Sequence, residues 1–191
     1  MTYLFNFRSI LYVFLFLFAV LEVSALHLQS HYVYDIPMCT LLLFVIYLLR
    51  IKLKLLKFHF LLLAIFLLLH SLGLYDAYTF YPLGFEYDYW VHAYFGFVAS
   101  LIIFRWLFLY LLNLQYQVIF LFTVFFVMGA SALHELYEYF GALILGEGEG
   151  VLFIGAGDLD QWDTQKDMLN NLLGVIIGTI FVYFNRSLIE S

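Results

Sequence analysis

Imidazole and carboxylate side chains recur one helical turn apart in this chain. In the stretch SALHELYEYF, His134 and Glu138 are four residues apart, and Glu135 precedes Glu138 by three. In FEYDYWVHAYF, Asp88 and His92 are again four residues apart. Residues with these spacings share one face of an α-helix. A histidine beside carboxylates can ligate a divalent metal ion or work as an acid–base pair, so both stretches are candidate sites of chemistry.

A third stretch, DLDQWDTQKDMLNN, extends the pattern. Asp163, Asp167 and Asn171 follow one another at intervals of four and would form a polar stripe leading into an apolar run. His70 ends another apolar run and is expected at the same depth. The predicted catalytic residues are Glu135, Glu138, His92 and Asp88. The predicted metal ligands are His92, His134, Glu135, Glu138, Asp163 and Asp167, with His70 and Asn171 as groups that orient them.

Each of these residues also has a purely structural interpretation. Asp88 could be a negative group that favours a helix amino terminus, and Asp163 could cap one. His70 could be an ordinary satisfied polar group, and His134 a hydrated group at a helix end. Without a metal, Glu135 and His92 could still act as an acid–base pair. If a metal ion is bound, carboxylate-rich ligation suits zinc, manganese, iron or magnesium, and the sequence does not choose among them.

The composition indicates a membrane protein. Of the 191 residues, 65% are hydrophobic and only 12% are charged, whereas a soluble domain is nearer half apolar and a quarter charged. The mean hydropathy is +0.98. No basic stripe marks a nucleic-acid surface. Cys39 is the single cysteine, so an intrachain disulfide and a CxxC metal site are excluded. No serine nucleophile motif is evident.

Six apolar stretches predict an all-α, polytopic membrane protein with six transmembrane helices in one domain, residues 1–191. Lys and Arg concentrate before the first stretch, in the run RIKLKLLK and after the last stretch, which predicts that both termini are cytoplasmic. An alternative is that the first stretch is a cleaved signal peptide. The stretches are 7–26, 34–49, 58–74, 89–112, 118–145 and 167–184. The residues predicted on the outer side are Glu22, Asp35, His70, Asp76, Asp88, His92, His134, Glu135, Glu138, Asp158, Asp160, Asp163 and Asp167.

The order of YDYWVHAYFGF, SALHELYEYF and DLDQWDTQKDMLNNLLGVIIG resembles the uncharacterised bacterial membrane proteins of the YjdF-like family. The most specific match is the string from Trp162 to Met168, and the resemblance covers residues 60–182. The pattern is more loosely similar to VanZ-like proteins, which are associated with low-level glycopeptide resistance. In that comparison Tyr89 and Trp90 replace a frequent lysine, and Glu138 replaces a frequent glutamine. The resemblance implies a multi-pass protein of the bacterial cytoplasmic membrane.

Three functions remain open at this stage. The first is a metal-assisted hydrolase or transferase at the outer leaflet, acting on a lipid-linked envelope substrate with a divalent metal ion as cofactor. The second is a non-catalytic envelope accessory protein, in which the same residues form a structural polar network. The third is a small proton-coupled transporter, although no inverted repeat supports it. The expected partner is the lipid bilayer, no nucleic acid is expected, and the oligomeric state is left open.

Overall fold

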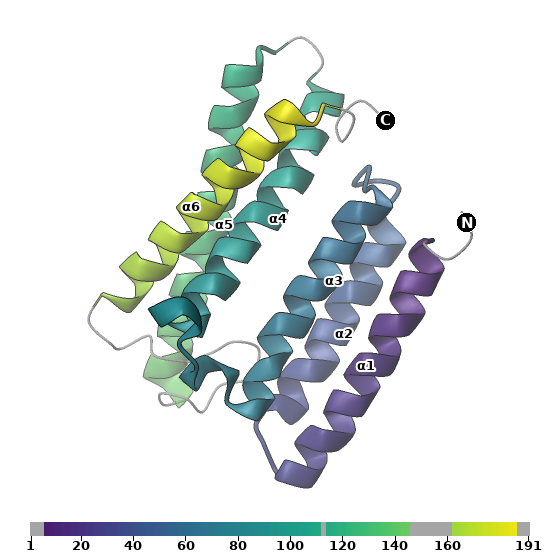
Figure 1. Cartoon of the computed structure of the whole chain (residues 1–191), viewed down its shortest axis with the longest axis vertical. Helices are drawn as coiled ribbons and strands as arrows, with labels where there is room; N and C mark the ends of the chain where they lie inside the picture. Colours follow the sequence, from purple (N-terminus) through teal and green to yellow (C-terminus); the bar gives the residue numbers. More distant parts are fainter. Residues whose placement is uncertain (1–5, 112–113, 146–161, 187–191) are drawn as a thin grey trace.

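A computed structural model describes residues 6–111, 114–145 and 162–186. Within these ranges the chain forms six α-helices and three short 3₁₀ turns, with no strand. The turns η1 (Leu72–Tyr75), η2 (Ala77–Thr79) and η3 (Pro82–Gly84) lie between the third and fourth helices (Figure 1). The helices are α1 (Phe7–Leu28), α2 (Tyr32–Leu49), α3 (Lys57–Ser71), α4 (Tyr87–Tyr110), α5 (Tyr116–Leu145) and α6 (Asp163–Phe184).

All six helices, with α3 extended through η1, are long and apolar enough to cross a membrane, so the predicted all-α fold with six spans is confirmed. Their outward faces carry large apolar side chains that water would not tolerate in such number. Phe16 is 68% exposed, Phe125 62% and Ile177 59%. A bilayer covers such faces, because lipid tails are as apolar as the side chains themselves.

Helices α2 to α6 all begin one to four residues earlier than the apolar stretches suggest. Helix α2 starts at Tyr32 and holds Pro37 in its interior, because a transmembrane helix tolerates a proline where neighbouring groups satisfy the freed carbonyl. Helix α6 starts at Asp163, and the residue before it, Trp162, has a φ of 74° and makes no side-chain cap. Hydropathy marks where the apolar run begins, whereas the polar first turn of a helix carries no such signal. Asp158 and Asp160 lie outside the described residues.

The helices form two groups of three (Figure 1). One buried cluster joins α1, α2 and α3 through residues such as Phe18, Leu43 and Phe60. A second joins α4, α5 and α6 and includes Leu101 and Ile119. The groups meet where α3 packs against α4. Two hydrogen bonds join α3 and α4. The hydroxyl of Tyr94 donates to the carbonyl of Leu62 (3.2 Å), and the hydroxyl of Tyr87 donates to the carbonyl of Leu69 (2.9 Å).

Helices α4 and α6 pack closely because glycines face the opposing backbone. A Cβ added at Gly174 would meet the carbonyl oxygen of Ala93, and one added at Gly96 would meet the carbonyl oxygen of Asn171. A Cβ added at Gly178 would meet the hydroxyl of Ser100 and lie 2.8 Å from the carbonyl oxygen of Phe97. The small-residue ridge of α6 therefore packs within the chain, and it sets α6 beside the polar outer half of α4.

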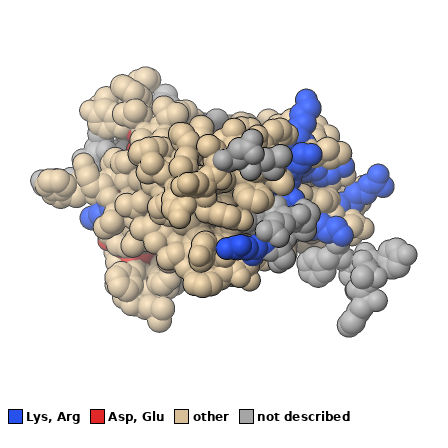
Figure 2. All heavy atoms as spheres, turned by 90° about the horizontal axis from the view of Figure 1, so that it is seen from above, with Lys and Arg blue, Asp and Glu red and all other residues tan. Residues whose placement is uncertain are grey.

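The two ends of the bundle differ in charge. The start of α1, the end of α6 and the connection from α2 to α3 lie at one end, the top in Figure 1. Seen from that end, Lys and Arg side chains are prominent and Asp and Glu are almost hidden (Figure 2). Buried Arg105 also bonds there, donating from Nε to the carbonyl of Lys54 at 2.9 Å. We propose from the positive-inside rule that this end is cytoplasmic.

Candidate functional site

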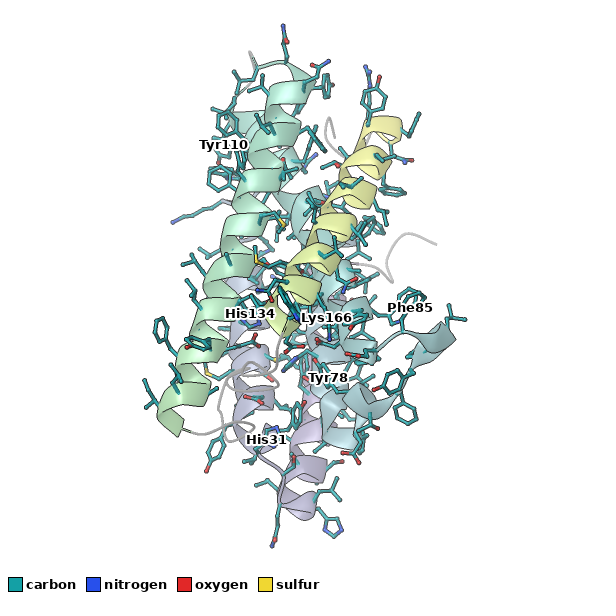
Figure 3. All side chains as sticks on the ribbon, turned by 90° about the vertical axis from the view of Figure 1, so that its left-hand side faces the viewer. His31, Tyr78, Phe85, Tyr110, His134 and Lys166 are labelled. Atoms are coloured by element: carbon teal, nitrogen blue, oxygen red, sulfur yellow. The ribbon has the colours of Figure 1, made fainter. Side chains whose placement is uncertain are left out.

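A cavity of about 620 Å³ is lined by residues of both three-helix groups, mostly near the start of α2, α4 and α6 and near the end of α3 and α5. All the predicted catalytic residues, metal ligands and orienting groups except Glu135 line this cavity. Figure 3 shows His134, Tyr78 and His31 in one half of the molecule, with Tyr110 at the far end. The lining residues include His31, Tyr32, Asp35, Phe66, His70, Tyr78, Asp88, His92, Phe95, Ser131, His134, Glu138, Asp163, Asp167 and Asn171.

Asp88, His92 and Asp167 form the tightest cluster of ligand-type side chains in the described ranges. One donor atom from each lies within 4.8 Å of the others. His92 Nε2 is 3.6 Å from Asp88 Oδ1 and 3.8 Å from Asp167 Oδ1. Donors that hold one tetrahedral ion at about 2.0–2.2 Å are roughly 3.3–3.6 Å apart. The two distances from His92 need to change by only a few tenths of an ångström to match this geometry, and the two carboxylate oxygens, which lie within 4.8 Å of each other, need to approach by at most about 1.2 Å.

The other ring nitrogen of His92 is held by α6. The amide of Asn171 lies with Nδ2 3.0 Å from His92 Nδ1, and the same nitrogen donates to Ser131 Oγ at 2.6 Å. Asn171 is 1% exposed, and its Oδ1 has no hydrogen-bond partner in the described part of the chain. This contact fixes the plane of the imidazole and points Nε2 at the two carboxylates, as partners of metal-binding histidines do.

The remaining predicted residues occupy separate positions around the cluster. His134 Nε2 and Glu138 Oε1 are 3.1 Å apart on α5 and both line the cavity. Asp163 lines it from the first turn of α6. Glu135 is 3% exposed and interacts electrostatically with Asp167, but it is not part of the cavity wall. The structure thus separates one close trio from an adjacent imidazole–carboxylate pair.

The opposite wall comes from α2, α3 and η2. The Tyr78 hydroxyl lies 3.0 Å from His70 Nδ1. Tyr32 places its hydroxyl over Gly73, where a Cβ would collide with it. Burial, then the negative charge of Asp88 and other neighbours, raises the pKa of Tyr78 well above its ordinary value. Tyr78 therefore keeps its proton at neutral pH and can serve as a hydrogen-bond donor.

Ser131, Asp35 and Tyr32 are among the polar lining residues that the sequence did not predict as part of the site. Ser131 lies three residues before His134 and seven before Glu138, so the helical period alone places it on their face. Asp35 is an acid in the first turn of a membrane helix and is 3% exposed, which marks it as inward-facing. Tyr32 has no comparable signal, because tyrosine is common in interfacial belts.

Comparison with known proteins agrees with this architecture. A family model described as "Predicted membrane protein (DUF2238)" matches residues 6–187. A relative, the inner membrane protein YjdF of Escherichia coli (strain K12), is 44% identical over 55 residues, which are 29% of this chain and 25% of the relative. The chain thus matches about a quarter of that relative's length. No solved structure matches. With its six spans, the protein is a multi-pass inner membrane protein.

Proposed function

For this chain, which belongs to the DUF2238 family of predicted membrane proteins, we propose a metal-assisted hydrolase or transferase that acts on a lipid-linked substrate at the outer leaflet. Asp88, His92 and Asp167 would hold one divalent ion. The observation that carries the proposal is the convergence of their three donor atoms within 4.8 Å on the wall of a cavity inside the membrane bundle.

Charge and solvation favour an ion at this position. Asp167 is 4% exposed, and its Oδ1 has no hydrogen-bond partner among the described residues. Two carboxylates beside one imidazole would be expensive to keep ionised in a membrane interior, where water is scarce. A divalent cation would neutralise both acids and supply the missing partner. Two carboxylate oxygens and one imidazole nitrogen also suit the common catalytic divalent ions.

The hydrogen bond of Asn171 sets what must change when an ion binds. A donation from Nδ2 to His92 Nδ1 leaves the ring hydrogen on Nε2, where the ion would have to bind. The hydrogen must then move to Nδ1, and the amide must turn so that Oδ1 accepts it. Asn171 Oδ1 has no partner in the described part of the chain, so the turn breaks no existing bond of that oxygen.

The neighbouring pair supplies the proton transfers. Bound to the site, a divalent ion polarises a substrate oxygen and activates water. Water oxygen would form a bond to the electrophilic carbon or phosphorus, and the bond to the leaving group would break. Glu138, held 3.1 Å from His134, would take the water proton and return it to the leaving group. A transferase would use the hydroxyl of a second substrate in place of water.

Metal analysis of the purified protein tests the proposal. Detergent-solubilised chain should bind about one zinc or manganese ion, and Asp88→Asn, His92→Gln and Asp167→Asn should each weaken binding by at least tenfold. Glu22→Gln is the matched control, because it removes a carboxylate that does not line the cavity. Folded wild-type protein that binds neither ion would contradict the proposal and favour the structural polar network instead.

A further inference from the structure

The cavity has two chemically different ends. Along α4 the lining runs from Asp88 through His92 to Phe95, which is about 10 Å of helix. On α2 it runs from Asp35 to Leu42, again about 10 Å. The outer end is lined by carboxylates, imidazoles and hydroxyls, and the inner end by apolar side chains. A ligand that fills both ends must therefore be amphipathic.

The apolar end is formed by aromatic rings and borders the bilayer. Phe66 of α3 and Phe95 of α4 are in contact, with ring centroids 5.4 Å apart at 46°. Leu42 lines the same end and is 43% exposed on a membrane-spanning helix, so the cavity reaches the lipid-facing surface there. A hydrocarbon chain can thus lie against the Phe66–Phe95 pair and continue into the membrane without entering water.

The polar end would offer a ligand one metal ion and one neutral hydroxyl, beside carboxylates that the ion would partly neutralise. No Lys or Arg lines the cavity within the described ranges, so the proposed metal ion would be the positive charge available to a ligand. Tyr78 also lines the cavity, and its hydroxyl is neutral and can donate a hydrogen bond. Tyr78, Asp88 and Glu138 line the same cavity, and the negative charges of the two carboxylates act on Tyr78.

We propose that the cavity binds a lipid phosphate, with phosphate oxygens shared between the metal ion and Tyr78 and the hydrocarbon chain against Phe66 and Phe95. This inference rests on the proposed function, because it requires the ion at Asp88, His92 and Asp167. A tetrahedral phosphate offers oxygens in directions toward both walls at once. In the tautomer with its hydrogen on Nδ1, His70 would donate to the Tyr78 hydroxyl oxygen across the 3.0 Å contact, which leaves the hydroxyl hydrogen for the phosphate.

Binding to manganese-loaded protein in detergent tests the inference. The probes are farnesyl monophosphate, farnesol and inorganic phosphate, titrated by calorimetry. Farnesyl monophosphate should bind at least tenfold more tightly than either other probe, because it alone satisfies both ends of the cavity. Equal affinity for farnesol would show that the phosphate is not recognised. Equal affinity for inorganic phosphate would show that the hydrocarbon chain is not recognised. Either result overturns the inference.

Two substitutions assign the contacts. Tyr78→Phe should weaken the binding of farnesyl monophosphate about tenfold, as expected for the loss of one hydrogen bond to a charged group. The affinity for farnesol should not change. The matched control, Tyr110→Phe, removes a hydroxyl that bonds the carbonyl of Lys52 at the other end of the bundle. Phe66→Ala should reduce the difference in affinity between farnesyl monophosphate and inorganic phosphate. Its control, Phe125→Ala on the lipid-facing side, should leave that difference unchanged. Unchanged affinities in both test variants would refute the assigned contacts.

The two proposals fail in different ways. If the wild-type chain binds neither zinc nor manganese, the proposed function itself is wrong. If manganese binding depends on Asp167 but the three probes bind with equal affinity, the metal site is supported and only the lipid phosphate is excluded as its ligand.

Discussion

Gly174→Ala probes the contact that brings the α6 residues of the site to α4. A Cβ at this position meets the carbonyl oxygen of Ala93 and lies 2.7 Å from the amide nitrogen of Phe97. Both neighbours are backbone atoms, so no side chain can rotate away. The clash can be relieved only if the two helices move apart.

The size of that movement follows from the same contact. Restoring an ordinary separation of 3.4 Å from Phe97 requires a shift of about 0.7 Å or more. Asn171 lies one turn before Gly174 on α6, and His92 is next to Ala93 on α4. The 3.0 Å contact between them would therefore lengthen to about 3.7 Å, which is beyond hydrogen-bond range. Overpacking of this kind costs about 1–3 kcal/mol of unfolding free energy, and loss of an orienting partner lowers metal affinity about 10–100-fold.

Unfolding in mixed detergent micelles, followed by circular dichroism, measures the first effect, and competition with a chelator measures the second. Gly129→Ala is the matched control, because Gly129 is exposed on α5 and a Cβ there meets nothing within 4 Å. The control should be neutral or slightly stabilising, since alanine is favoured over glycine in helices. If Gly174→Ala equals Gly129→Ala in stability and metal affinity, the close α4–α6 contact is not what assembles the site.

Four further outcomes follow from the structure. Asn171→Leu should lower metal affinity about 10–100-fold, whereas Asn171→Asp, which can accept the Nδ1 hydrogen of the imidazole, should retain it in the same chelator competition. Arg105→Met removes the hydrogen bond that the buried guanidinium donates to the carbonyl of Lys54 and should lower the unfolding free energy by about 1.5–3 kcal/mol, as expected for a hydrogen bond from a charged group. No change in the micelle assay would show that the bond is dispensable. Because burial raises the pKa of Tyr78 above its ordinary 10.0, its contribution to stability is fully present below pH 10.0 and falls as the pH rises toward the folded-state value, so Tyr78→Phe should flatten the alkaline part of the unfolding profile. In intact cells an impermeant thiol reagent should label Leu83→Cys and not Lys52→Cys, while the native cysteine is buried; the reverse pattern would invert the proposed orientation.

The amino-acid sequence by itself determines the class of this protein and the residues within each helix that can act together. Composition requires a bilayer, the lengths of the apolar runs give six spans, and the placement of Lys and Arg predicts the orientation. The four-residue spacing of Asp88 and His92, and of His134 and Glu138, needs only the helical period. Each of these is a local property of the chain, so it can be read without knowing the packing.

Only the tertiary structure decided which helices combine their polar groups. Asp167 joins Asp88 and His92, whereas Glu135, on the same helix as Glu138, lies off the cavity wall. In a membrane protein both the lipid and the core are apolar, so hydrophobic periodicity does not reveal which face of a helix points inward. The rotation and depth of α6 instead depend on where its glycines allow backbone contact with α4. That contact between segments some 80 residues apart is set by shape, which no local pattern records.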